Sequence, residues 1–187
     1  MFPDRSLDSI LPLLGIPVRF GKAKTNFLTG DQVLCCTRQE LEEFLSGGLI
    51  LDNIAAEHLC SMGYGDLIGC TCDGRITQPC TEQLCCPEYA GAWNETLMCV
   101  DWPSARRQGA WISHLTQDPA AQELTRLLDE EKRYLGPGMI RFSNRLGGDI
   151  CVMAAPVSDL GWISKGRSVL MRNLLRTMPQ ETPLPFV

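Results

Sequence analysis

One stretch of the chain, residues 41–69 (LEEFLSGGLILDNIAAEHLCSMGYGDLIG), constrains the fold more than any other. Its apolar spacing and its glycines predict, in order, a helix, a Gly-Gly turn, a short apolar strand, a sharp turn, a second helix, a Gly turn and another strand. A buried strand that leads directly into a helix is typical of an open α/β sheet whose faces are covered by helices. We therefore expect an α/β fold with an open, mainly parallel sheet and flanking helices.

The remaining sequence adds elements on both sides of this stretch. Residues 71–116 differ from the rest because they are rich in Cys, Pro, Gly and Thr and have weak periodicity, so we expect an irregular antiparallel insertion there. The other predicted elements are helices at 6–14, 38–46, 119–135 and 164–178, and strands at 16–20, 32–36, 139–143 and 149–155.

Length and composition limit the class of protein. With 187 residues and 44% hydrophobic residues, the chain can bury one sizeable core, so we expect a single domain over residues 1–187. A net charge of −5 argues against a nucleic-acid partner, which would require a basic surface. No apolar run approaches the roughly 20 residues of a membrane span, and the first residues lack the features of a signal peptide. We therefore predict a cytoplasmic protein without a membrane partner.

The turn after the strand at residues 49–52 carries the candidate ligand-binding residues. Asp52 and Asn53 follow the carboxyl end of that strand, where open α/β sheets bind ligands. The same two residue types are also preferred at the beginning of a helix, where a side-chain oxygen accepts a backbone N–H bond. The sequence thus favours a helix cap at Asp52 and leaves ligand binding by Asp52 and Asn53 as the alternative.

Nucleophilic catalysis finds little support in the sequence. A cysteine nucleophile needs a tight strand-to-helix turn and a nearby histidine that is oriented by an acid. Cys36 is flanked by another cysteine and a threonine, His58 lies on the apolar face of a predicted helix, and His114 has no acid at a suggestive spacing. We therefore name no catalytic residue.

The predicted insertion contains acids and aromatic residues of the kinds found at sugar-binding sites. A hydrolase would need two of the acids to face one cleft, and the aromatic rings could stack on sugars or simply cover a small core. The acids are Glu82, Glu88, Glu95 and Asp101, and the aromatic residues are Tyr89, Trp93, Trp102 and Trp111.

Ten cysteines are many for a protein of this size. Four of them lie within apolar strand or helix patterns, which favours small buried thiols in a reducing compartment. The six between residues 70 and 99 leave disulfides and zinc open, but their spacing does not match the usual paired zinc knuckles. We therefore predict no metal and no cofactor.

Three segments together resemble a known family. They are residues 41–69 with the motifs GG-x-x-x-D and GDLIG, residues 139–155 with the motif N-x-x-GG, and the last helix after Trp162. The set resembles the class I glutamine-amidotransferase-like domain of bacterial glycoside hydrolases and is similar to the β-galactosidase trimerisation domain. The resemblance implies a flavodoxin-like sheet that no longer performs amidotransfer. It also implies that the chain is a piece of a longer glycosidase-like protein.

We accordingly expect a non-catalytic accessory domain of a carbohydrate-active enzyme. By this resemblance its partners would be the glycosidase catalytic domain of the parent protein and further copies of itself in a homo-oligomer, and it would help assembly or shape the rim of the substrate cleft. Two alternatives remain open: a small-molecule or sugar-binding module, and a degenerate or unusual hydrolase.

Overall fold

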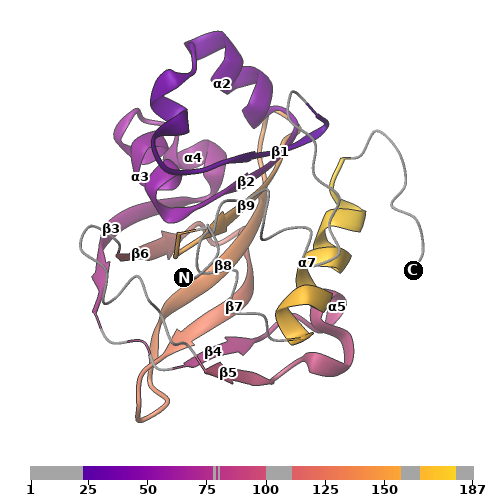
Figure 1. Ribbon diagram of the computed structural model, residues 1–187. Coiled ribbons are helices and arrows are strands. Elements are labelled where there is room, and N and C mark those ends of the chain that lie inside the picture. Colours follow the sequence, from indigo (N-terminus) through magenta and orange to yellow (C-terminus); the bar gives the residue numbers. More distant parts are fainter. Residues whose placement is uncertain (1–22, 78, 80, 100–110, 157–164, 180–187) are drawn as a thin grey trace, which may run out of the picture.

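The computed structural model describes residues 23–77, 79, 81–99, 111–156 and 165–179, and these residues form two sheets flanked by helices (Figure 1). The predicted helix at 6–14 and strand at 16–20 lie outside the described residues. The strands are β1 (Thr25–Leu28), β2 (Gly48–Leu51), β3 (Cys70–Ile76), β4 (Thr81–Leu84), β5 (Leu97–Cys99), β6 (Ile112–Gln117), β7 (Gln122–Leu128), β8 (Tyr134–Ser143) and β9 (Asp149–Met153). The helices are η1 (Gly30–Cys35), α2 (Arg38–Leu45), α3 (Asn53–Ser61), α4 (Gly65–Ile68), α5 (Pro87–Ala90), η2 (Gly91–Trp93) and α7 (Lys165–Thr177).

The larger sheet has seven strands in the order β1-β2-β9-β8-β7-β4-β5. Strands β1, β2 and β9 pair in parallel, whereas the pairings from β9 through β5 are antiparallel. The expected parallel sheet therefore occupies one half of a mixed sheet. The physical reason is the tight turn at residues 144–148, which returns β9 antiparallel to β8 and adds an antiparallel half to the sheet.

Helices cover both faces of this sheet (Figure 1). Leu49 and Leu51 of β2 pack into a core with α2, α3, α4 and the β3–β6 ribbon, while Ile50 packs on the opposite face with α5 and α7. Successive side chains of a strand point to opposite faces, so an entirely apolar strand is what a sheet covered on both sides requires. The prediction of an α/β fold with flanking helices is confirmed.

The stretch that dominated the sequence argument folds largely as predicted. Thr37 and Glu40 form a capping box at the beginning of α2, and Asp52 caps α3, as predicted, by accepting a hydrogen bond from the N–H of Ala55. Its last part is different. The last strand expected in this stretch is instead the short helix α4, and β3 starts only after Gly69, which has a left-handed φ of 75°.

Two other predicted elements were wrong in type. Residues 32–36 were predicted as a strand but lie mostly in the 3-10 helix η1, and the strand of this region is β1, for which no strand was predicted. Residues 119–135 were predicted as a helix but form β7 and the beginning of β8. The helical propensity of this segment is overridden because β7 pairs with both β4 and β8 and buries Leu124 and Leu127 on opposite faces.

The segment predicted as an insertion contributes to both sheets. Strands β3 and β6 pair antiparallel as a separate ribbon beside α3, whereas β4 and β5 form the far edge of the large sheet. Across the described ranges, no helix combines the length and the apolar character that crossing a bilayer requires.

Candidate functional site

The carboxyl ends of β1, β2 and β9 meet at one edge of the sheet because these strands run parallel. In open α/β sheets this edge is where ligands bind. Polar side chains gather there from α3 and the residue before it, and from β6 and the residue before it, and we call them the carboxyl-edge cluster. Its members are Asp52, Asn53, Glu57, Trp111 and Ser113.

Asp52 joins the loop after β1 to the beginning of α3. Its carboxylate accepts hydrogen bonds from the N–H of Ala55 at 2.9 Å and from the N–H of Gly30 at 2.9 and 3.0 Å to its two oxygens. The side chain is 4% exposed. The predicted cap is thus present, and the same carboxylate also fixes the backbone that follows β1.

Asn53 lies deeper in the same cluster and is fully buried. Its amide nitrogen donates to the carbonyl oxygen of Trp111 at 2.8 Å and to Oγ of Ser113 at 3.1 Å. Its Oδ1 is buried and has no hydrogen-bond partner among the described residues. Asn53 therefore joins α3 to β6 through one end of its amide and leaves the other end unsatisfied.

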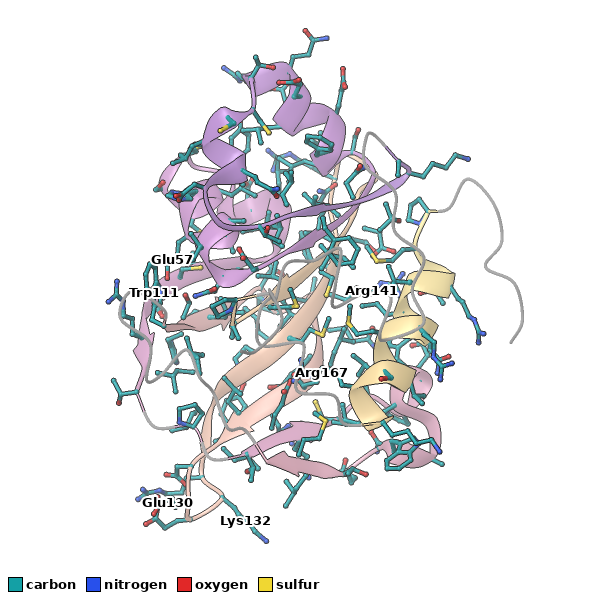
Figure 2. All side chains as sticks on the ribbon, viewed as in Figure 1. Glu57, Trp111, Glu130, Lys132, Arg141 and Arg167 are labelled. Atoms are coloured by element: carbon teal, nitrogen blue, oxygen red, sulfur yellow. The ribbon has the colours of Figure 1, made fainter. Side chains whose placement is uncertain are left out.

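Glu57 lies one helical turn after Asn53 on α3, and its side chain lies beside that of Trp111 (Figure 2). Its Oε1 accepts hydrogen bonds from the indole N–H of Trp111 at 2.7 Å and from the hydroxyl of Ser113. The guanidinium of Arg75 lies 4.2 Å from the centroid of the Trp111 ring, so the indole is also held by a cation–π contact. The half-buried Trp111 is therefore fixed at this edge by an acid on one side and a cation on the other.

Asp52 and Asn53 were identified from the sequence, whereas Glu57 and Ser113 were not, and Trp111 stood out there only as one of several aromatic residues. One signal was available, since residues four apart on a helix share a face and Asn53 and Glu57 have that spacing. No such signal pointed to Ser113, because its place beside α3 depends on the pairing of β6 with β3 and on the bond from its N–H to the carbonyl of Ala154.

The acids of the predicted insertion do not gather in one place. Glu82 is buried and pairs with Arg167 of α7, whereas Glu88 is exposed on α5. Glu95 is exposed in the turn before β5 and accepts a hydrogen bond from Gln83. Asp101 lies outside the described residues. The other aromatic residues of that set also differ in place: Tyr89 and Trp93 pack with α7, and Trp102 is not described.

Each histidine contacts an acid. Nε2 of His58 lies 3.0 Å from the carboxylate of Asp31, and Nδ1 of His114 lies 2.6 Å from that of Asp73. The hydroxyl of Thr116 also donates to Asp73, and these two hydrogen bonds lower the pKa of the Asp73 carboxyl. Cys36 is near neither histidine in the contacts of the described residues; its thiol lies 3.4 Å from the carbonyl oxygen of Gln32.

The cysteines are placed differently from one another. Eight of them are free thiols in the described ranges, and Cys60, Cys70 and Cys72 come together where α3 meets β3. Within the part of the chain that the structure describes, no group of three or more His, Cys, Asp and Glu side chains has an arrangement that could hold a metal ion.

A cavity of about 480 Å³ lies away from the carboxyl-edge cluster, between α2, α4 and the turn that joins β8 to β9. Its walls carry two guanidinium groups, two carboxylates and a phenol. The charged groups pair with one another, Arg38 with Glu42 and Arg145 with Asp66. The lining residues are Arg38, Glu42, Ser46, Gly63, Tyr64, Asp66, Leu67, Arg145 and Leu146.

Comparison with known proteins finds a structural similarity, whereas no protein-family model and no curated protein matches this sequence. Among solved structures, the chain is similar to alpha-L-fucosidase isoenzyme 2 from Paenibacillus thiaminolyticus, with a TM-score of 0.53 and 16% sequence identity. The match covers 82% of this chain and 24% of the fucosidase chain, so the chain spans about a quarter of the length of the structure that it matches. At this identity the match shows a shared fold, one that occurs within a glycoside hydrolase.

Proposed function

We propose that this chain is a non-catalytic accessory domain of a carbohydrate-active enzyme, where it helps to assemble the enzyme or completes the rim of the substrate cleft. The observation that carries the proposal is the extent of the structural match, which covers most of this chain but only 24% of a glycoside hydrolase. A fold of this size within a larger hydrolase is what an accessory domain would have. The flavodoxin-like, amidotransferase-like relationship inferred from the sequence motifs belongs to the same proposal.

The chemistry of the carboxyl-edge cluster supports a role without catalysis. A glycosidase needs one carboxyl group as a proton donor and a second carboxylate as nucleophile or base, both facing the substrate. Here Asp52 accepts backbone N–H bonds from two segments, and Glu57 accepts bonds from Trp111 and Ser113. Both acids therefore hold neighbouring elements together, which is a structural use of the position where such folds often carry a ligand.

Exposed apolar side chains at the two ends of the sheet offer surfaces for assembly. Leu34 of η1, 53% exposed, follows the carboxyl end of β1, and Leu146, 42% exposed, precedes the amino end of β9. Since β1 and β9 run in the same direction, these leucines lie at opposite ends of the sheet. Substituting one leucine at a time therefore tests whether an interface lies at one end of the sheet or at the other.

The first experiment is the solution mass of the reduced 187-residue chain, measured by light scattering, together with release of nitrophenol from 4-nitrophenyl α-L-fucoside. We expect a discrete dimer or trimer without turnover. If the interface lies at one end of the sheet, Leu34→Asp or Leu146→Asp should dissociate the oligomer, and the other variant serves as its matched control. If the wild-type chain releases nitrophenol and Glu57→Gln does not, the proposal is overturned in favour of a hydrolase. A monomeric mass in light scattering would exclude the assembly role.

The cavity lined by Arg38, Tyr64 and Arg145 favours a second candidate, a module that binds a small polar molecule such as a sugar. Its volume of about 480 Å³ falls within the range of small-molecule sites, and its lining offers both donors and acceptors. This candidate predicts saturable binding of a monosaccharide to a monomer, measured by calorimetry, and a weaker affinity in Tyr64→Phe. Leu97→Asp, at an exposed residue outside the cavity, is the control.

A further inference from the structure

Three thiols converge where the end of α3 packs against the beginning of β3. Sγ of Cys60 lies 3.9 Å from Sγ of Cys72 and 3.4 Å from the carbonyl oxygen of Cys70. Cys70 is 3% exposed, whereas Cys60 and Cys72 are half-buried at the margin of the core. Cys60 and Cys72 therefore combine a sulfur–sulfur contact with positions at the margin of the core, whereas Cys70 is buried.

The backbone around these thiols has little freedom to separate them. A Cβ added at Gly65 would lie 3.1 Å from the carbonyl oxygen of Cys70 and 3.9 Å from Sγ of Cys60, so the α4 backbone packs directly against both residues. β3 is held in turn by β6, where Cys72 pairs with Leu115. Bringing the sulfur atoms of Cys60 and Cys72 from 3.9 Å to a disulfide bond of about 2.05 Å requires a movement of roughly 2 Å. A side-chain rotation or a small shift of α3 can supply that movement.

We propose that Cys60 and Cys72 form a redox-active dithiol, which closes to an intramolecular disulfide by exchange with a low-molecular-weight disulfide such as oxidised glutathione. Cys60 is the attacking residue and Cys72 is the resolving residue. Cys70, whose sulfur is covered by the core, stays reduced. This site is independent of the accessory function proposed above.

The reaction balances as two successive exchanges. The Cys60 thiolate attacks one sulfur of the small disulfide, the S–S bond of that molecule breaks, and one small thiolate leaves. Cys72 then loses its proton to solvent and attacks Sγ of Cys60, and the second small thiolate leaves. Overall, the two protein thiols are oxidised by two electrons, and the small disulfide is reduced to two thiols once its thiolates take up the released protons.

The electrostatics of the cluster suit these roles. The interactions with the side chains of Cys70 and Cys72 lower the pKa of Cys60. The same interaction with Cys60 raises the pKa of Cys72. Since the thiolate is the nucleophile, Cys60 should react first, and Cys72 should act only once Cys60 has been consumed.

Closure would join the last turn of α3 to the first half of β3. The disulfide would close a short loop that contains α4, and it would fix α3, which carries Asn53 and Glu57, against the β3–β6 ribbon. Cross-links of short loops typically stabilise a domain, and for a chain of this size we expect the oxidised form to melt about 5–10 °C higher than the reduced form.

The test treats the reduced 187-residue chain with oxidised glutathione, traps the remaining thiols with iodoacetamide, and maps the peptides by mass spectrometry. Trypsin alone leaves all three cysteines on one peptide, because no Lys or Arg lies between Arg38 and Arg75. Chymotrypsin must therefore be added to cut within residues 61–69. We expect a cross-linked pair that contains Cys60 and Cys72, with Cys70 alkylated only after unfolding.

Three variants separate the roles. In Cys72→Ser the reaction with oxidised glutathione should stop at a glutathione adduct on Cys60. In Cys60→Ser the remaining thiols of this cluster should react with oxidised glutathione at least tenfold more slowly. Cys36→Ser, which removes another half-buried thiol, should behave as wild type. If a variant fails to fold, the peptide map of the wild-type protein alone still tests whether Cys60 and Cys72 become cross-linked.

The proposal is overturned if Cys60 and Cys72 both stay alkylatable while the exposed Cys35 acquires glutathione, or if Cys60 joins to a different cysteine. It is also overturned if one equivalent of Zn²⁺ protects all three thiols of the reduced protein from iodoacetamide, because the cluster would then be a metal site.

Discussion

Arg167 of α7 and Glu82 of β4 form an ion pair between the helix layer and the sheet, and their side chains are only 11% and 2% exposed (Figure 2 labels Arg167). Burial lowers the pKa of Arg167 to about 10, so its guanidinium remains charged at neutral pH. The pair joins the helix that covers one face to an antiparallel strand near the far edge of the sheet. Removing two charges from water is costly, so the contact matters mainly because each partner compensates for burial of the other.

Removing one member of this pair should destabilise the fold more than removing both. We expect Arg167→Met alone to lower the free energy of unfolding by about 3–5 kcal/mol, since it leaves the carboxylate of Glu82 buried without its cation. Arg167→Met combined with Glu82→Leu should recover much of that loss. Urea denaturation of the two single variants and the double variant measures the coupling energy between Arg167 and Glu82.

Arg145→Met, which removes an arginine from the exposed pair with Asp66, is the control and should cost at most about 1 kcal/mol of unfolding free energy. Equal losses for the buried and exposed arginines would refute this account.

We expect the main contribution of Asp52 to be to the stability of the fold. Asp52→Ala removes the cap of α3 and the acceptor of the Gly30 N–H, which should cost about 2 kcal/mol of unfolding free energy. Asp66→Ala removes the same charge from an exposed residue and should cost much less. Thermal and urea unfolding of both variants provide the comparison. If Asp52→Ala instead leaves the melting temperature unchanged and abolishes binding of a ligand, Asp52 is a ligand-binding residue as the sequence alternative allowed.

Cys85 should show an unusual pH dependence. Burial, with a contribution from the nearby charge of Glu123, raises the pKa of its thiol from 9.0 to about 11. Its alkylation by iodoacetamide should therefore still accelerate tenfold per pH unit between pH 8 and pH 10, when measured peptide by peptide in the folded protein. A plateau near pH 9 would contradict the raised pKa.

The same pKa shift affects stability. Between pH 9 and pH 11 the unfolded chain loses the Cys85 proton while the folded chain keeps it, so the unfolded state binds fewer protons and stability falls as the pH rises. Below pH 9 both states keep the proton, and Cys85 adds no pH dependence. Cys85→Ala should therefore make the fall of unfolding free energy with pH less steep in that interval.

Gly69 should tolerate substitution less well than Gly147. Both have a left-handed φ, 75° and 82°, so alanine pays a similar backbone cost at either position. A Cβ at Gly69 would also collide with the ring of Phe142, whereas a Cβ at Gly147 meets nothing within 4 Å. We expect Gly147→Ala to cost about 1 kcal/mol and Gly69→Ala at least about 1 kcal/mol more, measured by urea denaturation. Equal costs would mean that Phe142 moves away without penalty.

The local motifs of the fold could be predicted from sequence because each depends on residues close along the chain. The capping box of Thr37 and Glu40, the apolar strand β2, the cap at Asp52 and the turn at residues 144–148 all follow from short-range chemistry. The turn has further support that no sequence pattern indicated. The side-chain amide of Asn144 donates to the carbonyl oxygens of Leu45 and Leu67, which lie far away in sequence.

The candidate site was predictable only in part. Asp52 and Asn53 were identified from their position after a strand, but Glu57, Trp111 and Ser113 join them through contacts across more than 50 residues. The thiols of Cys60 and Cys72 are also brought together by packing, because nothing in their spacing distinguishes them from the other cysteines.

The sequence by itself determined that this protein alternates helices and buried strands, because apolar periodicity and turn residues act over a few positions. Only the tertiary structure decided that residues 122–128 are a strand and that the sheet is half antiparallel. It also decided that Glu82 is paired inside the protein with Arg167. The physical reason is that strand pairing and charge burial depend on partners distant in the chain, and a segment with helical propensity becomes a strand when two neighbouring strands satisfy its backbone.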